Sequence, residues 1–169
     1  MPNEAELEAK FWKALKSDMT VLLGLAGEAQ RGQAQPMTAQ LGERDGRGPI
    51  WFFTSSETDL VRDLGDGAPA SLHFASKGHD LFASLEGRLV PDNDPATIDR
   101  LWNRFVAAWF EQGRDDPKLR LIRFDPESAQ IWLNENSLFA GVKMMLGADP
   151  KREFKDKVAD TNLGGTRPS

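Results

Sequence analysis

Two histidines are the main candidates for acid–base or metal chemistry in this sequence of 169 residues, which contains no cysteine. His73 falls on the polar side of a predicted strand, where we expect it to face solvent or line a barrel, because no serine or carboxylate stands at a spacing typical of a catalytic pair. His79 lies in a predicted turn close to Lys77, where we expect it to be solvated, although these two side chains could meet a phosphate together. The spacing of the two histidines does not match that of metal ligands. Any redox or group-transfer chemistry would therefore come from a cofactor.

Small hydroxyl residues follow the apolar run that begins at Ile50. Thr54, Ser55 and Ser56 end this predicted strand, and a short helix follows, with Ser56 as its expected N-cap and Gly65 as its expected end. A strand end that leads into a helix start gathers unpaired backbone N–H groups, which favour an anion. The alternative is an ordinary strand followed by an ordinary cap, and the local residues alone favour that alternative.

The preceding predicted strand runs from Ala34 to Leu41 and contains Pro36. Proline has no backbone N–H to give to a neighbouring strand. This position therefore predicts an edge strand, a bulge, or a place where another group meets the backbone. A glycine-rich turn over residues 42–49 leads from this strand to the apolar one.

Composition and charge limit the possible partners. The formal net charge of −5 argues against a nucleic-acid-binding protein. The acidic N-terminus does not resemble a secretory signal, and no apolar run approaches the roughly 20 residues of a membrane helix. We expect one cytoplasmic domain over residues 1–150, with no nucleic-acid or membrane partner, and a charged, disordered tail over residues 151–169.

The hydrophobic patterns predict a mainly β (α+β) chain, with an antiparallel sheet or small barrel and helices at its ends. The predicted strands are Met19 to Ala26, Ala34 to Leu41, Ile50 to Thr54, Ala70 to Ala75, Leu81 to Leu89, Leu119 to Phe124 and Ala129 to Leu133, with a turn over Asp125 to Ser128. The predicted helices run from Asn3 to Ser17, from Asp94 to Gly113, and from Ser137 onward. The stripe of Trp102, Phe105 and Trp109 is expected in the core or at a subunit interface.

Several motifs in sequence order are together fairly specific. They are Gln-Pro-Met-Thr at 35–38, Ile-Trp-Phe-Phe-Thr-Ser-Ser at 50–56, Ala-Ser-Leu-His-Phe-Ala at 70–75, Ala-Ser-Leu-Glu-Gly-Arg-Leu at 83–89, Asp-Asp-Pro-Lys-Leu at 115–119 and Ala-Gln-Ile-Trp at 129–132. The chain thereby resembles the pyridoxamine 5'-phosphate oxidase-like flavin-binding split barrels, and most of all their general-stress-protein branch. The resemblance covers roughly Leu7 to Leu146.

The resemblance implies a six-stranded antiparallel split β-barrel with Greek-key character and peripheral helices. It further implies a homodimer that holds FMN, or FAD, at two sites between the subunits. By position, Gln35, Pro36 and Met37, with Thr38 beside them, would line the flavin ring. Phe53, Thr54 and Ser55 would meet the ribityl-phosphate end, and Trp132 would reach the flavin of the partner subunit.

The sequence departs from the family pattern at four positions. Gln35 replaces an arginine, and Asp59 and Leu60 replace the basic pair that holds the phosphate. Lys77, Arg62 or the partner chain could take over that role. Phe82 replaces the glutamine of true oxidases, so we expect no pyridoxamine phosphate oxidation. Two hypotheses follow: a flavin-dependent oxidoreductase linked to general stress, or a non-catalytic split barrel that binds flavin weakly or has lost it and binds another ligand or a protein.

Overall fold

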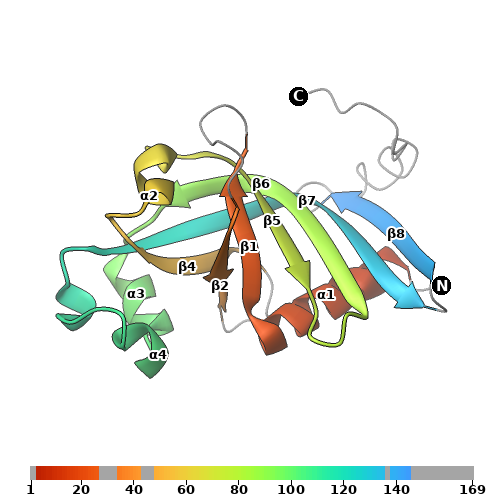
Figure 1. Ribbon diagram of the computed structural model, residues 1–169, viewed down its shortest axis with the longest axis horizontal. Helices are drawn as coiled ribbons and strands as arrows, with labels where there is room; N and C mark the ends of the chain where they lie inside the picture. The colour runs from red at the N-terminus through yellow and green to blue at the C-terminus, as the bar shows by residue number, and fades with distance from the viewer. Residues whose placement is uncertain (1–2, 27–33, 43–47, 136–137, 146–169) are drawn as a thin grey trace.

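The computed structural model describes residues 3–26, 34–42, 48–135 and 138–145. The centre of the expected turn over 42–49 and the expected tail over 151–169 lie outside this range. The elements are α1 (Glu4–Asp18), β1 (Thr20–Leu25), β2 (Gln35–Thr38), β3 (Gln40–Leu41), β4 (Ile50–Ser55), α2 (Asp59–Leu64), β5 (Ala68–Ala75), β6 (Leu81–Pro91), α3 (Pro95–Leu101), α4 (Arg104–Ala107), the 3-10 turn η1 (Gly113–Asp115), β7 (Leu119–Glu135) and β8 (Leu138–Met145) (Figure 1).

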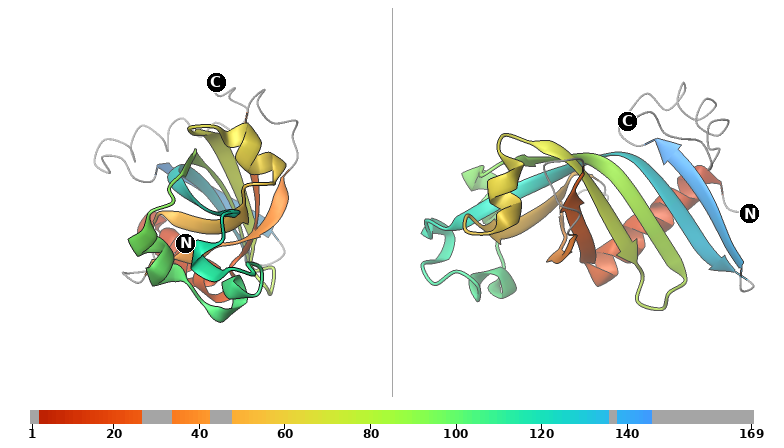
Figure 2. Two further views of the ribbon diagram at one scale, coloured as in Figure 1. Left: turned by 90° about the vertical axis from the view of Figure 1, so that its left-hand side faces the viewer. Right: turned by 45° about the horizontal axis from the view of Figure 1, so that its top comes forward.

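One antiparallel sheet forms the body of the protein, in the strand order β2-β1-β5-β6-β7-β4-β3, with β8 paired to β7. Its two end strands, β2 and β3, are consecutive in the chain and are separated only by Ala39. The sheet therefore curls back on itself, as Figure 2 shows, and β2 lies against β4. The expected fold class, a mainly antiparallel split barrel with peripheral helices, is confirmed. Eight strands are described instead of six, partly because Ala39 divides the strand predicted from Ala34 to Leu41 into β2 and β3.

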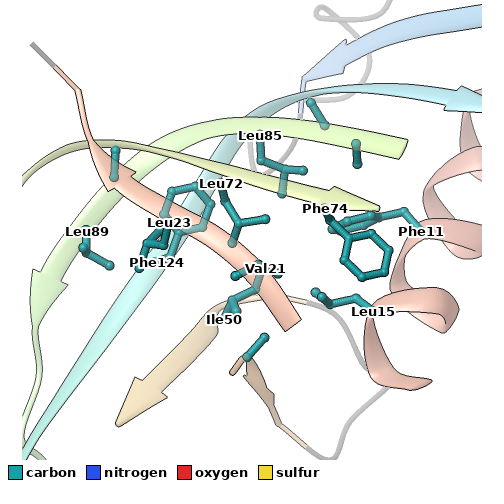
Figure 3. Packing of buried hydrophobic residues seen from close by; sticks show 14 of the residues in the cluster. Phe11, Leu15, Val21, Leu23, Ile50, Leu72, Phe74, Leu85, Leu89 and Phe124 are labelled. Atoms are coloured by element: carbon teal, nitrogen blue, oxygen red, sulfur yellow. The ribbon is translucent and has the colours of Figure 1, made fainter. Parts of the chain in front are cut away.

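The inside of the barrel is filled by side chains that alternate along each strand. Leu23, Leu72 and Phe124 come from β1, β5 and β7 and point toward one another (Figure 3). Phe11 and Leu15 of α1 close this core at one end, and both are fully buried. The start of α1 is held by the capping box predicted from the sequence, because the Asn3 side chain accepts from Glu6 N and Glu6 Oε1 accepts from Asn3 N.

A second apolar cluster covers the other face of β4. Its buried members are Trp51, Ile98, Leu101, Val106, Phe110, Leu119 and Leu121, with Phe53 and Trp102 packed against them. Since Ile50 and Phe52 lie in the main core, β4 is buried on both faces, as its continuous apolar run predicts. The three aromatic residues expected together in the core or at an interface lie in different environments. Trp102 packs into this second cluster, whereas Phe105 and Trp109 are 70% and 83% exposed.

The expected helix from Asp94 to Gly113 is broken in two. Asp94 caps its start, as predicted, and Pro95 is the first helical residue. The break lies at Trp102 and Asn103, where the Asn103 side chain accepts from Phe105 N and Val106 N and so starts α4 afresh. An asparagine side chain competes with the backbone carbonyls of a helix for these N–H groups, and here the N–H groups donate to the side chain.

The turn expected over Asp125 to Ser128 is wrong, because β7 continues through these residues. The pairing with β6 shifts there: Glu86 is opposite Ser128, whereas Gly87 is opposite Pro126. The extra residue on β7 forms a bulge, which bends the strand without ending it.

The helix expected from Ser137 onward is also wrong, because residues 138–145 form β8. This strand pairs with β7 from Ser128 to Glu135, the half of β7 that β4 leaves uncovered. Unpaired backbone groups along a long strand favour a neighbouring strand over a local helix. No helix in the described parts of the chain is long and apolar enough to cross a membrane.

Candidate ligand site at the seam of the barrel

The barrel has a seam where its two ends meet. β2 is hydrogen-bonded to β1, and within the described residues it pairs with no other strand. On the other side, β3 pairs with β4 only at Ile50 and Trp51, so that Phe52 to Ser55 are paired with β7 alone. Two backbone edges with unpaired N–H and C=O groups therefore line the seam. Such groups are obligatory hydrogen-bonding partners for water or a ligand.

The sequence-predicted ring-binding residues form the β2 side of the seam. Pro36 and Thr38 are exposed, whereas Gln35 and Met37 are half-buried, and Met37 packs against the main core. Pro36 lies in an edge strand, which was one of the three explanations predicted for it. All four residues border the seam within one short strand.

The predicted phosphate-end residues form the β4 side. The Phe53 ring points into the second cluster, where it meets the Trp102 ring edge to face with centroids 5.8 Å apart. The Ser55 hydroxyl accepts from Glu57 N at 3.1 Å. Thr54 faces the barrel, is 9% exposed, and its hydroxyl makes no hydrogen bond to any residue that the structure describes. The Thr54 hydroxyl is thus a side-chain group at this strand end that is available to a ligand.

Helix α2 follows directly, and its N-cap is Thr58 rather than the expected Ser56. The Thr58 hydroxyl accepts from Val61 N at 3.3 Å and donates to the Ser55 carbonyl at 3.0 Å, two bonds that Ser56 does not make. Leu60 is buried in the main core, where it offers packing and no hydrogen bond. Asp59 points into solvent, with its side chain 92% exposed and 3.2 Å from Arg62.

Sequence reasoning missed one basic residue at this end of the barrel. Arg120 of β7 stands directly opposite Thr54 in the antiparallel register. It is half-buried, and its Nη1 donates to the Pro117 carbonyl at 2.9 Å and to the Leu119 carbonyl at 2.7 Å. The alternation of Leu119, Arg120 and Leu121 places Arg120 on a strand face, but nothing in the sequence indicates which residue lies across from it.

Lys77 and Trp132 lie away from the seam of their own chain. Lys77 is in the turn between β5 and β6, where its N–H donates to Asp18 Oδ2 at 2.6 Å. In the same turn the Ser76 hydroxyl donates to Asp80 Oδ1 at 2.7 Å, and this bond lowers the pKa of the Asp80 carboxyl. Trp132 is on the outer face of β7, opposite Phe82. A single chain does not bring these two residues to Thr54.

Among the residues that the structure describes, neither histidine takes part in a recognisable catalytic arrangement. His73 Nδ1 is 3.1 Å from the Ser84 hydroxyl on the outer face of the sheet, with no carboxylate bonded to the ring in the described structure. The His79 ring stacks on Phe82, with centroids 6.0 Å apart. The described residues also contain no group of three potential metal ligands.

Comparison with known proteins places this architecture in a family. Residues 6–155 match the family described as pyridoxamine 5'-phosphate oxidase like. No curated protein matches the chain. A solved general stress family protein of Xanthomonas campestris pv. campestris is 59% identical, over 87% of this chain and 100% of that one, with a TM-score of 0.75.

Two further solved structures agree. The general stress FMN/FAD binding protein of Xanthomonas citri is 59% identical, over 85% of this chain and 99% of that one, with a TM-score of 0.73. A general stress protein 26 from Jannaschia sp. CCS1 is 33% identical, over 76% and 79% of the two chains, with a TM-score of 0.68. By fold and by sequence, then, this chain is a member of the pyridoxamine 5'-phosphate oxidase-like family and is similar to its general stress proteins.

Proposed function

We propose that this protein binds a flavin nucleotide, FMN or FAD, at the seam between β2 and β4 and serves as a flavin-dependent oxidoreductase in a general stress response. The observation that carries the proposal is the pair of unpaired strand edges at Gln35–Thr38 and Phe52–Ser55, next to the unbonded Thr54 hydroxyl. The 59% identical Xanthomonas citri protein, described as FMN/FAD binding, supports the choice of ligand.

The residues at the seam fit the parts of a flavin nucleotide. The edge of β2 offers backbone donors and acceptors to the polar rim of the ring, and Met37 offers an apolar contact. The Thr54 hydroxyl can donate to a ribityl or phosphate oxygen. A bound flavin supplies hydride or electron transfer, while this chain orients it and excludes water.

The first test is an absorption spectrum of the protein after addition of FMN, or in a second sample FAD, and desalting. We expect retained bands at about 370 and 450 nm, the absorption of the cofactor itself. A protein that releases both FMN and FAD on desalting would instead support the second hypothesis, a split barrel for another ligand or protein. The observation that favours this second function is the carboxylate of Asp59 and the apolar side chain of Leu60 at the usual basic positions.

Replacement of Thr54 by valine is expected to weaken FMN binding by about 5- to 10-fold, since one hydrogen bond is worth about 1 kcal/mol. Valine keeps the shape of the side chain and removes only the hydroxyl. The control is Thr20→Val, which removes an exposed hydroxyl on β1 and should leave the FMN affinity unchanged. Fluorescence titration with FMN measures both variants, and equal affinities for Thr54→Val and the wild type would remove Thr54 from the site.

We further propose that the protein is a homodimer in which Trp132 of each subunit meets the flavin of the other. Leu22, on the outer face of β1, is 45% exposed, and its register partners are Pro36 and His73. Trp132 lies on the same face of the sheet, three strands away. An exposed apolar side chain on the outer face of the sheet is a natural point of contact for a second copy.

Sedimentation is expected to give twice the 18.8 kDa mass of one chain. Leu22→Asp should shift the mass toward one chain, because it would bury an unpaired carboxylate in the contact. Ala9→Asp adds the same charge on an exposed position of α1 and should leave the dimer intact. A wild-type protein with the mass of a single chain would contradict both the dimer and the shared site.

A further inference from the structure

The structure assigns to Arg120 a role that the family's basic pair usually fills: we infer that its guanidinium recognises the phosphate of the flavin nucleotide. The inference rests on the proposed function and adds to it the cation that residues 59 and 60 do not provide. It concerns one position at the α2 end of the barrel, where β4 and β7 lie side by side.

Arg120 and Thr54 share the barrel-facing side of the sheet. They are direct partners in the antiparallel register, and such partners point to the same face. Phe52 and Ile122, which lie two residues away on each strand, are both fully buried in the main core. Arg120 is therefore carried at this end of the barrel, directly across from Thr54, whose hydroxyl makes no hydrogen bond to a described residue.

The bonds of Arg120 leave most of its donors free for a ligand. Nη1 donates to two backbone carbonyls, those of Pro117 and Leu119, which hold the side chain against the loop before β7. A guanidinium carries five N–H donors and stays charged at physiological pH. Within the described residues no carboxylate lies within ion-pair distance of Arg120. A positive charge that is half-buried and lacks a carboxylate partner favours an anionic ligand.

Two other cations, which lie close in sequence to the end of β4 and the start of β7, are already paired. Lys118 Nζ lies 3.5 Å from Glu57 Oε2, and Arg62 Nη1 lies 3.2 Å from Asp59 Oδ1. Both of these pairs are largely exposed. Arg62 and Lys118 thus provide matched controls, because they carry the same charge but are largely exposed and already paired with carboxylates.

The experiment compares the dissociation constants of FMN and riboflavin, two ligands that differ by the phosphate. For Arg120→Gln we expect FMN to bind about 10- to 100-fold more weakly, the usual effect of losing hydrogen bonds to a charged group, and riboflavin to change less than about 3-fold. Arg120→Lys should recover part of the FMN affinity, since it restores the charge without the bidentate geometry. Arg62→Gln and Lys118→Gln should leave both constants close to those of the wild type.

The outcomes separate the inference from the proposed function. If Arg120→Gln weakens FMN and riboflavin equally, Arg120 only holds the loop before β7, and the inference is wrong although the flavin site stands. The inference is also wrong, although the flavin site stands, if the wild type binds FMN and riboflavin equally well. Riboflavin binding also reports whether each variant is folded. If the wild type binds neither ligand, the proposed function fails and the inference fails with it.

Discussion

Replacement of Gly87 by alanine is expected to lower the free energy of unfolding by about 3 kcal/mol, the upper range for overpacking a core. Gly87 is buried in β6 at the point where the register with β7 shifts. A Cβ atom added there would lie 2.2 Å from the Asp125 carbonyl oxygen, 2.9 Å from the Phe124 ring and 2.9 Å from the Pro126 Cα. Two of these three neighbours are backbone atoms in the bulge, so the strand itself would have to move.

The matched control is Gly42→Ala, because a Cβ atom at Gly42 would meet nothing within 4 Å. We expect that variant to stay within about 0.5 kcal/mol of the wild type. Urea unfolding measures both variants, and the difference between them removes the general effect of adding a methyl group. Equal stabilities for Gly87→Ala and Gly42→Ala would show that the bulge relaxes without cost. The close approach of the two strands would then not be a requirement of the fold.

Replacement of Arg123 by glutamine is expected to lower the free energy of unfolding by about 2 kcal/mol, because it leaves two partly buried carboxylates without their cation. Arg123 Nε donates to Asp125 at 2.9 Å and 3.2 Å, and Nη1 donates to Asp92. The guanidinium also lies over the Trp51 ring, 5.9 Å from its centroid. This network joins the end of β6 to β7 and to the second apolar cluster.

The control for this prediction is Arg114→Gln. Arg114 makes a single bond to Asp99 at 2.7 Å, and half or more of each side chain is exposed. Water screens such a pair, so we expect a change below about 0.5 kcal/mol. Urea unfolding at matched salt measures both variants. Equal effects for the two variants would mean that burial and the second carboxylate add nothing to the Arg123 network.

The contribution of Arg123 should not depend on pH in the neutral range. Its hydrogen bond to Asp125 raises the pKa of the guanidinium. A group with a raised pKa adds stability fully below its unfolded pKa and loses it only when the pH rises through the folded value. For arginine both values lie far above neutrality. The difference in unfolding free energy between the wild type and Arg123→Gln is therefore expected to be the same at about pH 6 and at about pH 8.

The parts of the fold that follow from the sequence are those set by neighbouring residues. The alternation of Leu81, Ala83 and Leu85 with polar partners identifies β6, and the capping box of Asn3 and Glu6 identifies the start of α1. The apolar run from Ile50 identifies a strand buried on both faces. In each case the signal and the structure span the same few residues, so no distant contact is needed to interpret it.

Two of the three errors in the predicted elements occur where a distant segment overrides a local signal. Residues 138–145 have helical spacing but form β8, because the second half of β7 offers a free edge. Asp125 and Pro126 belong to a turn by composition, yet they form a bulge, because Gly87 lets β6 approach them. The helix expected from Asp94 breaks at Asn103, whose side chain takes two backbone N–H groups. Two of these three outcomes depend on residues far away in the chain.

The candidate site divides in the same way. The sequence by itself determined the family, through motifs in β2, β4, β6 and β7. It also put Thr54 at a strand end and included an edge among three explanations for Pro36. Only the tertiary structure decided that β2 and β4 face each other across a seam, that Leu60 is turned into the core, and that Arg120 stands opposite Thr54. The physical reason is strand register: which residues share a face across two strands depends on pairing between segments more than 60 residues apart (Thr54 and Arg120), and no local pattern records that pairing.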